Sequence, residues 1–318
     1  MFIRQVDIEK DSSSIAEIWR ACFSDDLSYI DTFISDCLPH TKSWILLRND
    51  KPVSILSLIP SYIPFSMYYP SLDREISLDG SKSGFPSKRE YLYGAYVYGV
   101  ATLPEHRGNS YSRLLADKAI EYSIENRLDY IIVKPAEVSL FNLYSKFGFE
   151  TFLSCHCTAV EFSEDGEKIS PLLPDFISLS EERLYSLRES SRLDSFLWPK
   201  SILSYALREA LSRPGATALV NEDLYFIAAP SYSSLNNVEI LETNARTKEQ
   251  ARQIVSYIRK ENPSAQSISI CTSISNSPAI FNIFEKPTRD RSALLKILNS
   301  DAEIKKFLSE QYLSLPME

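Results

Sequence analysis

The chain has 318 residues, a formal net charge of −8 and 44% hydrophobic residues, which is a globular composition long enough for two domains. The acidic balance argues against sequence-independent binding of nucleic acid. No apolar run approaches the roughly 20 residues that a membrane-spanning helix needs, and the N-terminus lacks the apolar core of a signal peptide. We therefore expect a cytoplasmic protein with no membrane partner.

The first residues alternate between helical and extended patterns. "DSSSIAEIWRACF" predicts a helix with a capping box at Ser14 and Glu17, and residues 29–38 repeat the helical period. Residues 43–50 and 52–63 predict two strands joined at Asn49-Asp50, a hairpin signal. Residues 70–90 are polar and rich in turn formers, which indicates a long loop or a ragged hairpin.

The next stretch predicts an alternation of strands and helices. Residues 91–103 are rich in aromatic and β-branched residues and predict a strand. The helix that follows should bury a stripe of apolar side chains, and after it come a strand, a short helix ending at Gly148 and a last strand. The stripe consists of Tyr111, Leu114, Leu115, Ala119 and Tyr122.

Glycine is scarce, with only 8 in the chain, and five of them fall between residues 80 and 108. They are Gly80, Gly84, Gly94, Gly99 and Gly108. Gly94 and Gly99 lie inside the strand at 91–103, where they predict a bulge or a close approach by another backbone.

The second half partly repeats the first. Helices are predicted at 180–191, 199–211 and 247–260, the last with a capping box at Thr247 and Gln250, and strands at 216–220, 224–230, 237–245 and 267–274. Two amphipathic helices, 291–299 and 302–313, should end the chain. A strand–turn–helix–strand order thus occurs at 91–133 and again at 238–274, where the turn has no glycine, so we interpret the second copy as degenerate and without a phosphate loop.

The cysteines and histidines predict no metal site. Five scattered cysteines form no disulfide framework. "SCHCT" has no second ligand pair elsewhere, and strand alternation places Cys155 and Cys157 on one face, so we interpret both as structural. His40 and His106 have no partners for a triad and are expected on the surface. The five cysteines are Cys22, Cys37, Cys155, Cys157 and Cys271.

"RGNSYS", residues 107–112, stands where a strand gives way to a helix. The first turn of a helix offers unpaired N–H groups and the positive end of the helix dipole, both of which favour an anion. Arg107 could add a charge-assisted hydrogen bond. The segment from Gly108 to Ser112 therefore predicts a site for a pyrophosphate.

Here the sequence resembles the GCN5-related N-acetyltransferase (GNAT) superfamily. The phosphate motif of that family, Arg/Gln-x-x-Gly-x-Gly/Ala between a bulged strand and a helix, is similar to "VATLPEHRGNSYSRLL". The second signature, a short helix ending in Tyr-x-x-x-Gly-Phe, matches "YSKFGF" at 144–149. The resemblance covers residues 1–162 and in outline the whole chain, because some members, among them Eis-type aminoglycoside-modifying enzymes, pair an active domain with a degenerate one.

The resemblance implies an α/β (α+β) GNAT fold: a mixed, mostly antiparallel central sheet flanked by helices, followed by a second GNAT-like α/β domain. It places an acetyltransferase domain with an acyl-CoA site at 1–162, a linker at 163–176 and a degenerate GNAT-like domain at 177–318. It implies acetyl-CoA as co-substrate and no metal. The implied cofactor-binding residues are Val100, Ala101, Thr102, Arg107, Gly108, Asn109, Ser110, Tyr111 and Ser112.

Three positions depart from the family pattern. Ser110 and Ser112 stand where glycine or alanine is usual; serine keeps the backbone donors, and its steric cost is severe only at positive φ, which we do not expect in a segment that enters a helix. Glu137 replaces an asparagine that contacts the cofactor in many members.

The resemblance assigns Tyr144 as the acid that protonates the leaving thiolate, because a phenol with a pKa of roughly 10 keeps its proton at neutral pH; a core tyrosine is the structural alternative. The general base stays open among Glu75, Glu90, Glu105, Glu137 and a water relay. Tyrosines of the 91–103 strand and its neighbour line an acceptor cleft or, by our preferred interpretation, pack on the sheet. They are Tyr62, Tyr68, Tyr69, Tyr91, Tyr93, Tyr96 and Tyr98.

The predicted function is acetyl transfer from acetyl-CoA to a primary amine of a small molecule or peptide. The alternative is a non-catalytic acyl-CoA-binding sensor or scaffold that retains the fold.

Overall fold

The computed structural model describes residues 1–23, 25–65, 91–162, 174–190, 195–231, 236–272 and 288–311. The chain forms two compact units. Unit 1 consists of residues 1–151, 196–202 and 294–308, and unit 2 of residues 152–195, 203–293 and 309–318. The predicted loop at 70–90 lies wholly outside the described residues, as does most of the predicted linker at 163–176. The domain boundaries drawn from the sequence stay a prediction.

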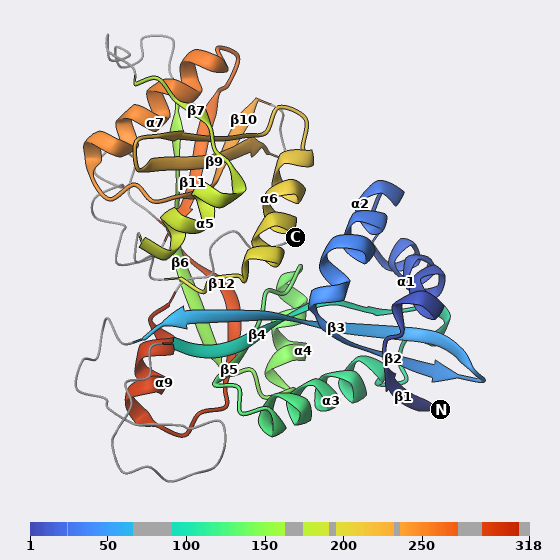
Figure 1. Ribbon diagram of the computed structural model, residues 1–318. Coiled ribbons are helices and arrows are strands. Elements are labelled where there is room, and N and C mark those ends of the chain that lie inside the picture. Colours follow the sequence, from blue (N-terminus) through green and yellow to red (C-terminus); the bar gives the residue numbers. More distant parts are fainter. Residues whose placement is uncertain are drawn as a thin grey trace. The chain divides into compact units, whose positions relative to one another are not determined.

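Unit 1 contains a sheet with the strand order β1-β2-β3-β4-β5-β12 (Figure 1). Only the β4–β5 pair is parallel, and the other neighbours are antiparallel. The strands are β1 (Phe2–Gln5), β2 (Lys42–Arg48), β3 (Lys51–Pro64), β4 (Tyr91–Thr102), β5 (Tyr130–Val133) and β12 (Thr288–Ile297), whose last residues pair with β5. The β2–β3 turn holds Asn49 and Asp50 at positive φ, as the hairpin signal predicts.

Helices of unit 1 bury apolar stripes against the sheet. α3 packs Tyr111, Leu115 and Ala119 into a core cluster with strands β2 to β5, as predicted, whereas Leu114 is 36% exposed. The helices are α1 (Ile8–Phe23), α2 (Leu27–Thr32) with the π-helical turn η1 (Phe33–Cys37) and the 3-10 turn η2 (Leu38–His40), α3 (Tyr111–Glu125), α4 (Val138–Ser145) and α9 (Ala302–Ser309).

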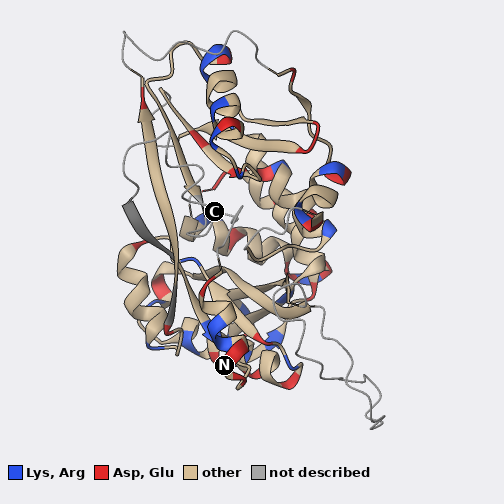
Figure 2. Ribbon diagram, turned by 90° about the vertical axis from the view of Figure 1, so that its left-hand side faces the viewer, with Lys and Arg blue, Asp and Glu red and all other residues tan. Residues whose placement is uncertain are grey.

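Unit 2 contains a sheet with the order β6-β11-β10-β9-β8-β7, in which only β10 and β11 are parallel. The strands are β6 (Thr151–Glu161), β7 (Ile177–Ser178), β8 (Thr217–Asn221), β9 (Leu224–Pro230), β10 (Asn237–Thr243) and β11 (Ser267–Thr272). The helices are α5 (Glu181–Ser190), α6 (Lys200–Ser212) and α7 (Lys248–Glu261). Acidic and basic residues intermingle along the helices of both units (Figure 2). None of the described helices is long and apolar enough to cross a membrane.

Both units repeat one motif. A strand, a helix and a parallel strand follow one another as β4–α3–β5 in unit 1 and as β10–α7–β11 in unit 2. The repeat predicted from the sequence is therefore confirmed, as is the predicted fold class of a mixed, mostly antiparallel sheet flanked by helices.

Two predictions about local structure were wrong, and the strand β1 was missed. The segment at 291–299 is not a helix but most of it belongs to β12, because a short apolar run fits either period and pairing with β5 satisfies its backbone. β1 was missed because four residues carry no readable alternation. α1 begins at Ile8, so Ser14 lies inside the helix and caps nothing.

The cysteines of unit 2 differ in part from expectation. Cys155 and Cys157 share one face of β6, as alternation predicts, and their sulfur atoms lie 3.4 Å apart. The structure also joins Cys157 to Cys271 by a disulfide. The sequence did not predict this bond because 114 residues separate the two cysteines.

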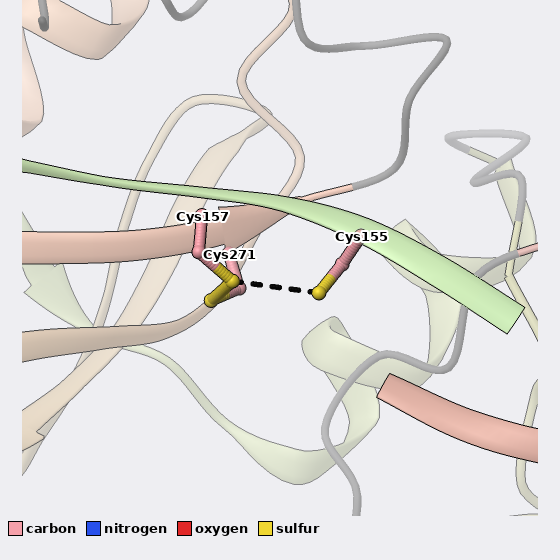
Figure 3. Close-up of a disulfide and its surroundings, with 3 residues drawn as sticks. All are labelled: Cys155, Cys157 and Cys271. Atoms are coloured by element: carbon pink, nitrogen blue, oxygen red, sulfur yellow. Dashed lines mark hydrogen bonds between the residues drawn. A yellow bond between two sulfur atoms is a disulfide. The ribbon is translucent and has the colours of Figure 1, made fainter. Parts of the chain in front are cut away.

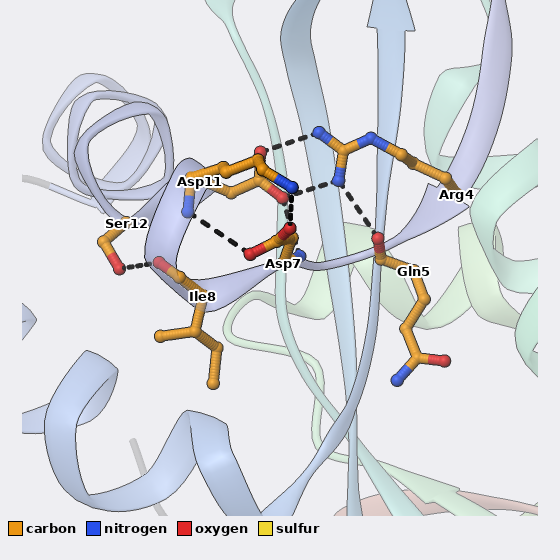
Figure 4. A network of polar contacts seen from close by, with 7 residues as sticks. Arg4, Gln5, Asp7, Ile8, Asp11 and Ser12 are labelled. Atoms are coloured by element: carbon orange, nitrogen blue, oxygen red, sulfur yellow. Dashed lines mark hydrogen bonds and ion pairs between the residues drawn. The ribbon is translucent and has the colours of Figure 1, made fainter.

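The start of α1 is set by an ion pair between Arg4 and Asp11 (Figure 4). Both nitrogen atoms at the end of the guanidinium donate to the Asp11 carboxylate, at 2.6 and 2.8 Å, and the Asp7 N–H donates to the same carboxylate at 2.8 Å. The Asp11 side chain is 4% exposed. The hydrogen bonds from Arg4 lower the pKa of Asp11, so the interaction ties β1 to the first turn of α1 in the charged state.

We expect Asp11→Asn to lower the free energy of unfolding by about 1–3 kcal/mol at neutral pH, the loss for a charged hydrogen bond with one partner removed. Because folding lowers the pKa of Asp11, its contribution is present above the unfolded pKa of about 3.9 and is lost as the pH falls through the folded value. Urea unfolding of the wild type and of Asp11→Asn at decreasing pH should therefore show that the difference between their free energies of unfolding becomes smaller in acid. Glu121→Gln, which breaks the exposed Lys118–Glu121 pair of α3, should behave like the wild type throughout; a difference for Asp11→Asn that persists undiminished in acid contradicts the ionic explanation.

Candidate functional site

The end of β4 contains a bulge. Ile55 of β3 pairs with Ala101 and Ser57 pairs with Tyr98, so the single residue Leu56 faces both Gly99 and Val100. Gly99 has a φ of +59°, the left-handed conformation that glycine adopts without strain. The bulge predicted from the position of Gly99 is confirmed.

Gly94 and Gly99 also admit large neighbours. A Cβ on Gly99 would lie 2.6 Å from Cη2 of Trp19 in α1, and a Cβ on Gly94 would lie 2.3 Å from the ring of Tyr130 in β5. The predicted close approach is real, but an aromatic side chain makes it in each case, not another backbone.

β4 continues past its parallel partner. The pairing with β5 runs from Gly94 and Tyr130 to Val97 and Val133, whereas β4 extends to Thr102. β5 ends at Val133, so the last residues of β4, from Tyr98 to Thr102, have no partner in β5.

The last residues of β4 are held by side chains. The Ser54 hydroxyl donates to the Ala101 carbonyl at 2.7 Å and also contacts the Thr102 hydroxyl at 2.7 Å. The Thr102 carbonyl accepts hydrogen bonds from the Cys22 thiol and from Nε of Arg107, each at 3.2 Å. Arg107 is thus fixed to the strand end that precedes its own loop.

The loop between β4 and α3 is compact and exposed. It contains the 3-10 turn η3 (Pro104–His106) and Gly108, which has a φ of +79° and open space where a Cβ would stand. The Asn109 side chain donates to the carbonyls of His106 and Arg107, at 3.0 and 3.3 Å. These two bonds hold the loop together through the side chain of one of its own residues.

The backbone N–H groups from Gly108 to Arg113 have no acceptor in the part of the chain that the structure describes, and the first helical bond runs from Leu114 N to Ser110 O at 3.1 Å. No side chain caps the helix either. Consecutive unpaired amides at the positive end of a 15-residue helix favour an anion. The structure thus gathers Arg107, Gly108, Asn109, Ser110 and Ser112 in one turn.

Two further arginines stand near this turn. Nη1 of Arg48, at the end of β2, lies 3.5 Å from the Tyr111 hydroxyl, and Arg113 donates to the Lys146 carbonyl at 2.7 Å with its guanidinium 5.1 Å from the Phe147 ring centroid. The sequence offered no signal for Arg48, because 63 residues separate it from Tyr111. The Tyr111 side chain itself is buried in the core, so only its amide belongs to the loop.

Ser110 contradicts the expectation that no residue of this turn takes a positive φ. Its φ is +60° and its ψ is 24°, the left-handed helical conformation, at the N-cap of α3. The family pattern carries glycine at this position, and the reason is now visible: a residue other than glycine pays roughly 1–2 kcal/mol in this conformation. Ser112, in contrast, lies inside α3 with ordinary helical geometry.

Tyr144 lies near the end of α4 and is 7% exposed. It packs against Phe147 and Phe149 with ring centroids 5.9 Å away and belongs to the same core cluster as Tyr111 and Val97, against which Val100 also packs. Burial raises the pKa of Tyr144 to about 12. No described group hydrogen-bonds to its hydroxyl, and a phenol with this pKa is neutral at pH 7. Gly148, at a φ of +85°, ends this segment as predicted.

The other candidates remain scattered. Glu105 and Glu137 are exposed, and Glu137 accepts a hydrogen bond from Ser139 at 3.2 Å, while Glu75 and Glu90 lie outside the described residues. His40 is exposed as predicted. His106 is half-buried in the exposed loop, so it reaches the surface as predicted, although its Nδ1 is buried and has no partner among the described groups.

The tyrosines of β4 mainly pack. Tyr96 and Tyr98 are buried; Tyr96 contacts Trp198 at 5.6 Å and Tyr98 contacts Trp19 at 5.8 Å between ring centroids. The Tyr98 hydroxyl is hydrogen-bonded to that of Tyr29. The preferred interpretation of packing is confirmed for these two, whereas Tyr93 is 54% exposed and Tyr68 and Tyr69 lie outside the described residues.

One family matches part of the chain. Residues 87–152, which include β4, the loop, α3, β5 and α4, match the family described as "Acetyltransferase (GNAT) domain". No curated protein sequence is similar enough to match the chain.

Solved structures are similar over nearly the whole chain. A probable N-acyltransferase from Enterococcus faecalis V583 has a TM-score of 0.69 and 14% identity, covering 97% of this chain and 74% of that one. A GCN5-related N-acetyltransferase from Anabaena variabilis has a TM-score of 0.67 and 13% identity, covering 94% and 73%. Eis1 from Mycobacterium abscessus has a TM-score of 0.64 and 11% identity, covering 93% and 74%. At these identities the likeness shows the fold.

Ser110, at the N-cap of α3, and Ser112, inside α3, provide a matched test of the backbone conformation at Ser110. We expect Ser110→Gly to leave the free energy of unfolding unchanged or to raise it by up to about 1 kcal/mol, because relief of the left-handed strain offsets the extra chain entropy of glycine. Ser112→Gly should lower it by about 0.5–1 kcal/mol, as glycine does inside a helix. Urea unfolding of the two variants measures the difference, and equal losses in both would contradict the conformation of Ser110.

Proposed function

We propose that this chain, which belongs to the GNAT acetyltransferase superfamily through the domain at 87–152, transfers an acetyl group from acetyl-CoA to a primary amine of a small molecule or peptide. We further propose that it acts in the cytoplasm. The single observation that carries the proposal is the run of unpaired amides from Gly108 to Arg113, which begins directly after Arg107 and beside the free end of β4.

The amides and Arg107 would hold the pyrophosphate of the cofactor. Backbone donors do not depend on side-chain identity, so Ser110 and Ser112 leave the number of donors unchanged. The guanidinium of Arg107 adds positive charge at a point where Nε is already fixed by the Thr102 carbonyl. A fixed donor loses little freedom when the ligand binds.

Acetyl transfer requires a neutral amine, a polarised thioester carbonyl and a proton for the departing thiolate. A backbone N–H in the segment from Val100 to Thr102, where β4 extends past the end of β5, would polarise the carbonyl. Tyr144 would supply the proton, because a phenol whose pKa is raised to about 12 by burial stays protonated at neutral pH. We assign no general base.

The second unit supports one cofactor site per chain. At the start of α7 the Thr247 hydroxyl accepts from Gln250 N at 3.2 Å, and the Gln250 side chain accepts from Arg246 N and Thr247 N at 2.8 and 3.1 Å. These internal caps occupy three backbone amides at the start of α7, whereas no such cap is present at the start of α3. We therefore propose that residues 177–318 are a degenerate GNAT-like domain without a CoA site.

The alternative function is a non-catalytic acyl-CoA sensor. The strained Ser110 favours it, because a departure from glycine at this turn is what loss of selection on catalysis would leave. Binding alone does not separate the two functions, whereas turnover does.

We expect one equivalent of acetyl-CoA to bind per chain, and Arg107→Ala to weaken that binding by about 1.5–3 kcal/mol, the value of a charged hydrogen bond. Isothermal titration calorimetry measures both quantities. Arg20→Ala on the exposed side of α1 makes the same change of charge away from the loop and should keep the wild-type affinity. Unchanged affinity in Arg107→Ala, or a second equivalent that survives it, would overturn the assignment.

Tyr144→Phe should leave acetyl-CoA affinity nearly unchanged and lower the turnover rate by roughly 10²–10⁴-fold, the usual contribution of a positioned acid. Thermal stability should also stay close to that of the wild type, because no described group loses a hydrogen bond. The assay is thiol release with an amine found by screening a panel of acceptors. If Tyr144→Phe turns over at the wild-type rate, Tyr144 is a core residue without a catalytic role. If the wild type binds acetyl-CoA tightly but turns over no amine, the sensor function is favoured.

A further inference from the structure

Three cysteines of unit 2 meet between β6 and β11 (Figure 3). Cys157 and Cys271 stand opposite each other in the antiparallel register and form the disulfide. The sulfur of Cys155, two residues earlier on β6, points toward this bond and lies 3.4 Å from Sγ of Cys157. All three sulfur atoms lie within 4.8 Å of one another.

The three differ in exposure. Cys155 is buried, Cys157 is half-buried and Cys271 is exposed. A thiolate from solution attacks the disulfide sulfur that it can reach, so Cys271 is the point of entry and Cys157 is the sulfur that leaves.

The hydrogen bond between Cys155 and Cys157 has a defined direction. Sγ of Cys157 carries no proton while it is part of the disulfide, so the Cys155 thiol donates and Cys157 accepts. A donor aimed at a sulfur stabilises the thiolate that forms when the disulfide opens. Because a thiol of lower pKa leaves faster, Cys155 is placed to speed the opening.

We propose that the Cys155–Cys157–Cys271 cluster is a redox site that exchanges with a low-molecular-weight thiol. The thiolate of that compound bonds to Sγ of Cys271, and the electron pair of the old bond goes to Sγ of Cys157, where the Cys155 S–H holds it. A second thiolate then attacks the mixed disulfide, so that the small thiol is oxidised to its own disulfide while Cys157 and Cys271 become thiols. The reverse sequence closes the bond again.

The placement gives the exchange a structural consequence. The bond cross-links β6 and β11 across 114 residues of chain, and both strands belong to the sheet of unit 2. Closing a long loop restricts the unfolded chain, so the oxidised unit is the more stable form. In the cytoplasm, where we place the protein, a disulfide is usually transient or redox-sensing.

The test follows the reduction of the oxidised protein by glutathione, with thiols trapped by acid and alkylation and located by peptide fragmentation. We expect reduction of the native, folded protein, a transient glutathione adduct on Cys271, and reversal by oxidised glutathione. Cys155→Ala should slow the opening about three- to tenfold, whereas Cys155→Ser, which keeps a donor, should open at nearly the wild-type rate.

Cys37→Ala, which removes a buried thiol of unit 1, is the matched control and should not change the rate. Three results would each overturn the proposal: a disulfide that resists glutathione until the protein unfolds, an adduct on Cys157 in place of Cys271, and equal rates for Cys155→Ala and the wild type. Isolation of the protein with all three cysteines reduced around a bound zinc ion would also overturn it, in favour of a metal site.

Discussion

The geometry of unit 1 depends on the backbone of β4 at Gly99. A residue at a φ of +59° with a tryptophan ring 2.6 Å from where its Cβ would be must be glycine. On one side this lets Trp19 of α1 pack over the strand, and on the other the bulge lies in the part of β4 that extends past the end of β5. The same local conformation therefore positions α1 and lies next to the strand end where the loop to α3 begins.

The two repeats with parallel strands follow the same path but differ in how the first turn of the helix is capped. In unit 2 a bulge also interrupts β10 between Ile240 and Glu242, and α7 connects β10 to its parallel neighbour. The difference lies in the first helical turn. In α7 the side chains of Thr247 and Gln250 accept hydrogen bonds from backbone amides of the first turn, which stabilises the helix. In α3 the corresponding amides are left to water or to a ligand. A structural role alone does not explain this loss of helix stability.

Local signals in the sequence predicted the features that depend on local physics. The positions of Gly99 and Gly148 and the Thr247–Gln250 pair each fix the backbone within a few residues, and all three were confirmed. Features that depend on distant partners could not be predicted in this way: the extended conformation of β12 depends on β5, Arg48 reaches Tyr111 only through the fold, and Cys157 meets Cys271 across the sheet. Ser110 is a different case. We expected no positive φ there because the segment enters a helix, but the loop holds Ser110 in the left-handed conformation.

The strain at Ser110 bears on stability more than on affinity. A conformational cost that is the same in the free and the bound protein cancels from the free energy of binding and remains only in the free energy of unfolding. Serine would weaken the binding of the cofactor only if its side chain occupied space that the ligand needs. At the nearby Gly108, the space where a side chain would stand is open. A serine at this turn is therefore compatible with a working anion site, provided that the rest of unit 1 is stable enough to hold it in the left-handed conformation.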